Sequence, residues 1–106
     1  MGWFDQHEDS YAQVENAPHE ASFSHELIAG AAAFEAAKAY EKHCAENGKP
    51  DSHATAKELI AGFAGAFIDR QVETRGLDYI DKERAKREAE RHVEESFTED
   101  VYVDTY

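Results

Sequence analysis

The chain has 106 residues, the size of one small domain, and 42% of them are hydrophobic, which is enough for a single core. Acidic residues outnumber basic ones by 23 to 11, and the formal net charge is −12. This charge excludes nucleic acid and anionic membrane surfaces as general partners, because both attract basic proteins. It favours a basic protein partner or a cationic ligand.

The cysteine content and the first residues predict a cytoplasmic protein. Cys44 is the single cysteine, so the chain cannot form an intramolecular disulfide, which fits a reducing compartment. Residues 1–6 have neither the basic region nor the apolar run of a secretory signal. No segment approaches the roughly 20 apolar residues that are needed to span a bilayer.

The first segment, residues 1–21, is polar and lacks a helical or strand period, which predicts an arm rather than a regular element. It contains the aromatic residues Trp3, Phe4 and Tyr11. Such an arm either packs back on the body of the protein or docks on a partner.

Residues 22–97 are expected to form a helical domain. The first helix begins after Ser22 or Ser24 and is rich in alanine, the best helix former, until Gly48 and Pro50 end it. The second helix begins at Asp51 or Ser52 and ends at Gly76. Its apolar residues recur at steps of three and four: Leu59, Ile60, Phe63, Phe67 and Val72.

The third helix is expected to open at Asp78, with Asp81 in its first turn, and to continue to about residue 97. It is dense in charge and has only a thin apolar stripe, formed by Ala85, Ala89, His92 and Val93. The tail, residues 98–106, is expected to be disordered, with a short edge strand as the alternative.

An internal repeat connects the first two helices. The segment Glu26-Leu27-Ile28-Ala29-Gly30 recurs 32 residues later as Glu58-Leu59-Ile60-Ala61-Gly62. Because glycine weakens a helix by up to about 1 kcal/mol relative to alanine, two such positions indicate close approach of two backbones. We therefore expect an all-α fold with a helical hairpin, whose packing interface consists of Gly30, Ala33, Phe34, Gly62, Phe63 and Ala66.

Self-association is the alternative use of these small residues. A hairpin covered by a weakly apolar third helix leaves apolar area exposed, and a second copy of the chain would cover it.

Catalytic and metal-binding motifs are absent from the sequence. A glycine-rich phosphate loop, a Gly-x-Ser-x-Gly turn and a His-Glu-x-x-His motif are all missing. His43, Cys44 and His53 could form a metal cluster around the first turn, but solvated histidines and a buried thiol explain these residues better. No cofactor, metal ion or catalytic residue is predicted.

The long polar and small-residue segments resemble the CipC-like (concanamycin-induced protein C) family of fungi. The resemblance rests on PHEASFSHELIAGAAAFEAAKAYE at residues 18–41, NGKP at 47–50 and AKELIAGFAGA at 56–66. It implies a domain of unknown function that is associated with responses to antibiotics and other stress. His19, His25 and Glu26 lie in the most distinctive stretch and are candidate ligand or partner residues.

Two functions follow as expectations. The first is a non-enzymatic stress-response protein that acts by protein–protein contact, including self-association. The second is a metal- or small-ligand-binding helical module that uses His19, His25 and Glu26.

Overall fold

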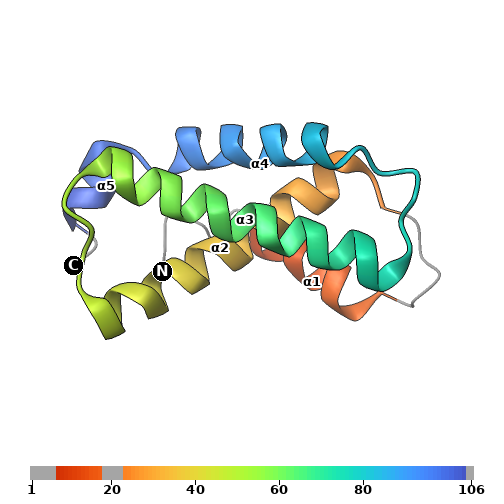
Figure 1. The fold of residues 1–106 in the computed structure, drawn as a ribbon, viewed down its shortest axis with the longest axis horizontal. Helices are drawn as coiled ribbons and strands as arrows, with labels where there is room; N and C mark the ends of the chain where they lie inside the picture. The colour runs from red at the N-terminus through yellow and green to blue at the C-terminus, as the bar shows by residue number, and fades with distance from the viewer. Residues whose placement is uncertain (1–6, 18–22, 105–106) are drawn as a thin grey trace.

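The computed structural model describes residues 7–17 and 23–104, and these ranges contain five α helices and no strand (Figure 1). The helices are α1 (Glu8–Asn16), α2 (His25–Asn47), α3 (His53–Arg75), α4 (Lys82–Ser96) and α5 (Glu99–Asp104). The predicted all-α class is confirmed. Within the described ranges, no helix is long and apolar enough to cross a membrane.

Local capping residues set the ends of α2 and α3, as the sequence predicts. The Ser24 hydroxyl accepts a hydrogen bond from the Leu27 amide, and the Ser52 hydroxyl accepts one from the Thr55 amide. Gly76 ends α3 in the left-handed conformation, with φ of 65°.

The third predicted helix begins later than expected. Its N-cap is Asp81, whose carboxylate accepts a hydrogen bond from the Arg84 amide, so the predicted opening at Asp78 is wrong. Asp78 instead lies in the turn between α3 and α4. Leu77 and Ile80 are buried on either side of it, and the Ile80 amide donates to the Leu77 carbonyl. Burial of these two residues stabilises the turn, so α4 begins only after Asp81.

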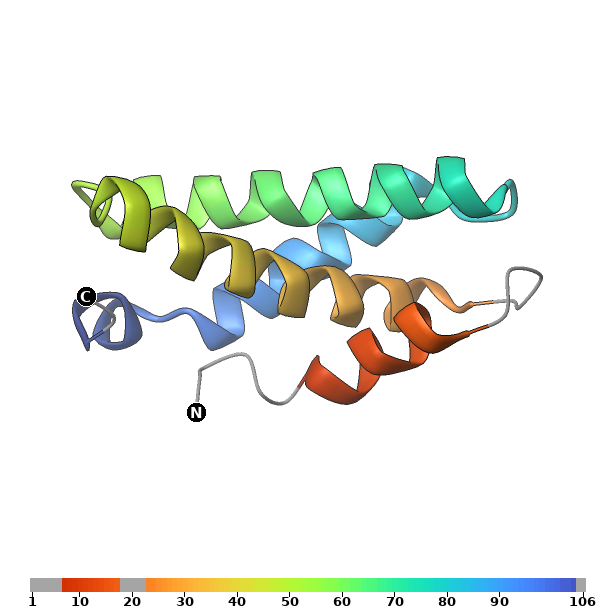
Figure 2. The ribbon, with the colours of Figure 1, turned by 90° about the horizontal axis from the view of Figure 1, so that it is seen from below.

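The helix α2 is the centre of the fold. It forms an antiparallel hairpin with α3, and α1, α3 and α4 all pack against it (Figure 2). Every residue from Ile28 to Phe34 is buried. The alanines of this segment let three neighbouring helices approach α2, which explains why α2 has no polar face over this length.

The N-terminal segment contains a helix, so the aperiodic arm predicted for residues 1–21 is wrong for residues 8–16. The short helix α1 packs on α2 and buries Val14 completely. Its Tyr11 ring lies 4.8 Å from the Phe34 ring, measured between centroids. Contacts with α2, rather than a strong local pattern, stabilise this helix.

The tail also differs from the expectation of disorder, because residues 99–104 form α5. The Tyr102 hydroxyl donates to the Pro50 carbonyl at 2.6 Å, and the Lys49 ammonium donates to the Val103 carbonyl at 3.1 Å. The tail therefore closes over the turn that joins α2 to α3.

The two repeat glycines have different surroundings, and the predicted close crossing at Gly30 and Gly62 is wrong. A Cβ atom on Gly30 would lie 2.9 Å from the Ser10 hydroxyl oxygen, so Gly30 is the close approach of α1, not α3. A Cβ atom on Gly62 would meet no heavy atom within 4 Å. Gly30 is buried because α1 covers α2 at this point, whereas Gly62 is exposed.

Candidate functional site

The structure gives His25 a structural role and leaves Glu26 exposed. The Asp81 amide donates a hydrogen bond to Nε2 of His25 at 2.9 Å, which ties the start of α2 to the start of α4. Glu26 is exposed beside Ser10, Ser24 and Leu27, with which it lines a shallow recess of about 220 Å³. His19 lies outside the described residues. The described residues of the predicted set therefore do not converge on one ligand.

The possible metal cluster of His43, Cys44 and His53 does not form. The His43 ring packs against the Phe63 ring, and Nε2 of His53 donates to the Phe97 carbonyl at 2.7 Å. Cys44 is buried beside Tyr40; burial raises the pKa of the Tyr40 hydroxyl, and so does the neighbouring thiol. Over residues 7–17 and 23–104, no three side chains of the His, Cys, Asp and Glu types form a group that could hold a metal ion.

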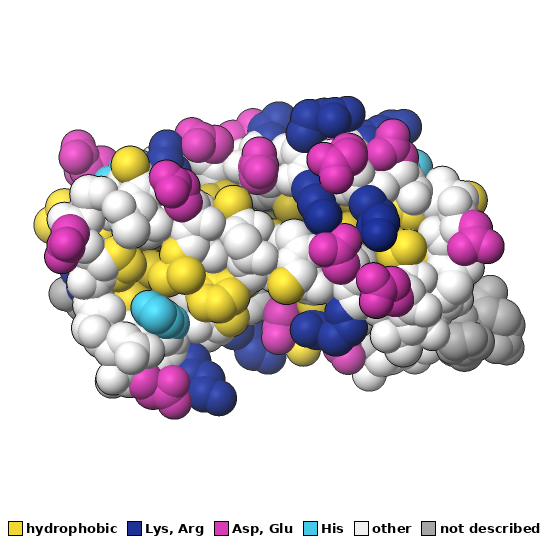
Figure 3. Space-filling model, viewed as in Figure 1, with side chains coloured by type: hydrophobic (Ala, Val, Ile, Leu, Met, Phe, Trp, Pro, Cys, Tyr) yellow, Lys and Arg dark blue, Asp and Glu magenta, His cyan; other side chains and the backbone are white. Residues whose placement is uncertain are grey.

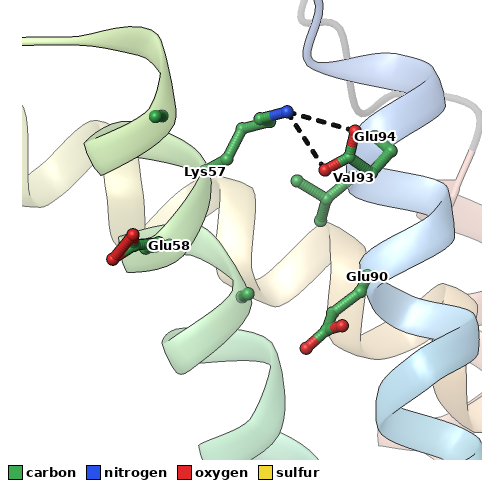
Figure 4. A pocket seen from close by; sticks show the side chains of 7 residues that line it. Lys57, Glu58, Glu90, Val93 and Glu94 are labelled. Atoms are coloured by element: carbon green, nitrogen blue, oxygen red, sulfur yellow. Dashed lines mark hydrogen bonds and ion pairs between the residues drawn. The ribbon is translucent and has the colours of Figure 1, made fainter.

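An open groove of about 330 Å³ runs between α3 and α4 (Figure 4). It is lined by Ala54, Lys57, Glu58, Ala61, Glu90, Val93 and Glu94. The Lys57 ammonium lies 3.1 Å from a Glu94 carboxylate oxygen and so bridges the two helices. Exposed ion pairs of this kind contribute only about 0–1 kcal/mol, so the groove is held open mainly by the packing of the helices beneath it.

A partly apolar surface lies on the outer side of the α2–α3 hairpin, and we call it the outer face. It consists of Ala39 and His43 of α2 with Leu59, Gly62, Phe63 and Ala66 of α3. In the space-filling view, apolar side chains gather around a histidine on this side of the molecule (Figure 3).

The outer face is accessible to solvent along its whole length. Gly62 and Ala66 are exposed, and Leu59 and Phe63 are half-buried. The residues that α3 turns toward the core are different ones: Ala56, Ile60, Ala64, Phe67 and Ile68. Gly30, Ala33 and Phe34 of the predicted packing interface are buried, but Gly30 and Phe34 meet α1 rather than α3. Gly62, Phe63 and Ala66 lie on the outer side of α3, so the predicted contact between these two sets does not form.

The sequence did not predict a contact between two histidines, one buried and one half-buried. The ring centroids of His7 and His92 lie 4.6 Å apart, where the start of α1 meets α4. His7 is only 8% exposed. The apolar stripe of α4 contains His92 and so indicated that it faces inward, but no local signal points to His7 as its neighbour.

Burial favours the neutral form of both rings. It lowers the pKa of His7, and the nearby His92 lowers it further while Glu95 opposes the shift. Burial likewise lowers the pKa of His92, and Arg91 adds to the effect. Three carboxylates oppose it: Glu95, Glu26 and Glu88.

Comparison with known proteins identifies the family. No curated protein and no solved structure matches the chain. A family model described as "Virulence factor CipC-like" matches residues 10–100, a range that spans α2, α3 and α4 completely. The chain therefore belongs to the CipC-like family, as its long small-residue segments indicate.

Proposed function

We propose that this protein acts by protein–protein contact, without catalysis, and that a second copy of the chain docks on its outer face. The observation that carries the proposal is the accessible apolar surface of Leu59, Gly62, Phe63 and Ala66. An apolar surface on a protein of this charge loses contact with water when a copy covers it, which favours association.

The charges at the edges of the outer face favour a two-fold arrangement. Lys42 is exposed on the α2 edge and Glu58 on the α3 edge, near the same end of the hairpin. A two-fold axis that runs along the hairpin places α2 of one copy opposite α3 of the other. Each lysine then faces the glutamate edge of the partner, so charges of opposite sign meet at both rims.

The size and charge of the molecule predict weak association. The segment from Leu59 to Ala66 is only about 10 Å long at 1.5 Å per residue, so the interface is smaller than the standard size of stable complexes. Two copies with a net charge of −12 each also repel one another. Added salt screens this repulsion and strengthens association.

Sedimentation velocity tests the proposal. The native chain is expected to dimerise as its concentration rises toward about 1 mM, the range of weak association, and to do so more readily in salt. Ala66→Glu places a charge on the outer face and abolishes the dimer. Ala45→Glu makes the same change at another exposed alanine of the hairpin, outside the outer face, and leaves it intact. A native chain that stays monomeric at this concentration and in salt contradicts the proposal.

The stress-response role is part of the same proposal and rests on the association with stress that the resemblance to the CipC-like family implies. Cells that carry Ala66→Glu in place of the native chain are expected to respond to antibiotic stress like a deletion strain. Cells that carry Ala45→Glu are expected to respond like the parent strain. Equal responses of the two variant strains would show that the outer face is not needed for the stress response.

A further inference from the structure

The start of α1 packs against both α2 and α4. His7 immediately precedes α1, and its ring meets the His92 ring of α4 at 4.6 Å with a tilt of 59°. One turn further along, Ser10 packs so closely on Gly30 of α2 that no Cβ atom would fit there without movement. This end of α1 is therefore held by tight packing. One of its contacts, between His7 and His92, joins two titratable rings.

The other end of α1 is held by a different kind of contact. The Arg75 guanidinium at the end of α3 donates to the Val14 carbonyl at 2.8 Å and to the Ala17 carbonyl at 3.5 Å. Since an arginine stays charged at every relevant pH, this anchor does not respond to acid. The two ends of α1 thus differ in their sensitivity to protons.

We propose that the contact between His7 and His92 is a pH-sensitive latch, which docks the start of α1 on α2 and α4 while both rings are neutral and releases it when they are protonated. Two imidazolium ions in this partly buried contact repel one another and lose part of their hydration. Release at this end, with Arg75 still holding the other, swings α1 away from Gly30 and Phe34 of α2. Apolar surface of α2 that is covered at neutral pH then becomes accessible.

Charged groups around the latch shift the pKa values of its two rings. Glu95, Glu88 and Arg91 approach it from α4, and Glu26 approaches it from α2. The carboxylates favour protonation of the rings and Arg91 opposes it. Nε2 of His92 is buried and has no hydrogen-bond partner among the described residues.

The direction and the pH range of the response follow from linkage. The docked histidines have pKa values below 6.5, and a released histidine returns to about 6.5, so the released state binds more protons. Docking is therefore strongest above about pH 7.5 and weakens as the pH falls through 6.5. Between pH 7.5 and 5.5 the opening constant rises about tenfold for each histidine that stays neutral while docked, and about a hundredfold for both.

Amide hydrogen exchange measures this opening. Protection factors for residues 11–16 are compared with those for residues 60–68 of α3 in the same sample at pH 7.5 and 5.5. The native chain is expected to lose protection in α1 tenfold to a hundredfold relative to α3. The variant carrying both His7→Phe and His92→Phe keeps rings at both positions but loses the response. His43→Phe, a change at a histidine outside the latch, retains the response at a protein concentration too low for dimers.

Two results would overturn the latch. The first is a protection ratio between α1 and α3 in the native chain that does not change with pH. The second is a response that persists in the double variant. If the double variant does not fold, proton NMR of the native imidazoles decides: titration of His7 and His92 near 6.5, independent of any change in α1, contradicts the proposal.

Discussion

At the residue scale, Gly30 and Gly62 occupy equivalent positions of the internal repeat and have opposite surroundings. Ser10 presses on Gly30, whereas the space above Gly62 is open. Glycine is needed at Gly30 because of a close approach, whereas within the single chain the glycine at position 62 lowers helix stability and relieves no contact. The repeat therefore predicts the same role for both glycines, but the packing of the helices gives them different roles.

Alanine at each position is expected to have opposite effects. Gly62→Ala stabilises the protein by about 0.5–1 kcal/mol, because alanine favours the helix and meets no neighbour. Gly30→Ala destabilises it by about 1–2 kcal/mol, because overpacking against Ser10 outweighs the gain in helix propensity. Chemical unfolding at low protein concentration measures both. Adding Ser10→Gly to Gly30→Ala should recover stability; a Gly30→Ala variant as stable as Gly62→Ala contradicts the assignment.

Tyr40 presents a second residue-scale test. Its side chain is completely buried, and its hydroxyl has no hydrogen-bond partner among the described residues apart from the adjacent Cys44 thiol, a weak partner. Tyr40→Phe is therefore expected to raise the free energy of unfolding by up to about 1 kcal/mol, since it removes an unsatisfied polar atom and keeps the ring against Phe97. A loss of more than about 1 kcal/mol on thermal unfolding would show that the hydroxyl is satisfied.

At the element scale, the shortest helices depend on contacts outside themselves. The helix α1 has nine residues and α5 has six, and helices of this length are not stable alone in water. Arg75 links α1 to the end of α3 and also stacks on the Phe23 ring, 5.2 Å from its centroid. Arg75 therefore adds a polar anchor to the apolar contacts that α1 makes with α2.

Arg75→Met removes the donors and keeps most of the side-chain length. It is expected to lower the free energy of local opening of α1 by about 1–3 kcal/mol, because it leaves the Val14 carbonyl without its charged partner. Hydrogen exchange of residues 11–16 measures this change at pH 7.5. Arg70→Met is the matched control, since Arg70 is exposed over the Phe67 ring and does not contact α1 in the described structure. Equal exchange in the two variants would rule out the anchor.

At the scale of the whole molecule, the net charge of −12 works against the compact state. The α3–α4 ion pairs of Lys57 with Glu94 and of Lys86 with Asp69 are partly exposed and contribute little. The remaining acidic groups repel one another over distances that salt screens. Repulsion among the acidic groups is therefore expected to outweigh the attraction within these pairs.

Salt is accordingly expected to stabilise this protein. Raising sodium chloride from about 0.01 M to about 0.15 M shortens the screening length from about 30 Å to about 8 Å and should raise Tm by several degrees. Thermal unfolding followed by circular dichroism at pH 7.5 measures the shift, at a low protein concentration that excludes dimers. A fall in Tm would show that attractive pairs dominate instead.

The sequence by itself determined the helical class and the ends of the long helices. Ser24, Ser52 and Gly76 act on amides and carbonyls within a few residues of themselves, so their effect is encoded locally. Alanine in α2 and the spacing of apolar residues in α3 likewise act within one helix. The family resemblance also depends only on the order of residues, and the comparison confirms it.

Only the tertiary structure decided which faces are covered and which side chains meet. Whether Gly30 or Gly62 is buried depends on where α1 docks, and the His7–His92 contact joins residues from opposite ends of the chain. The short helices α1 and α5 exist because distant residues hold them. Local propensity specifies an element, but burial is a property of the assembled core, and no neighbouring residues in the sequence encode it.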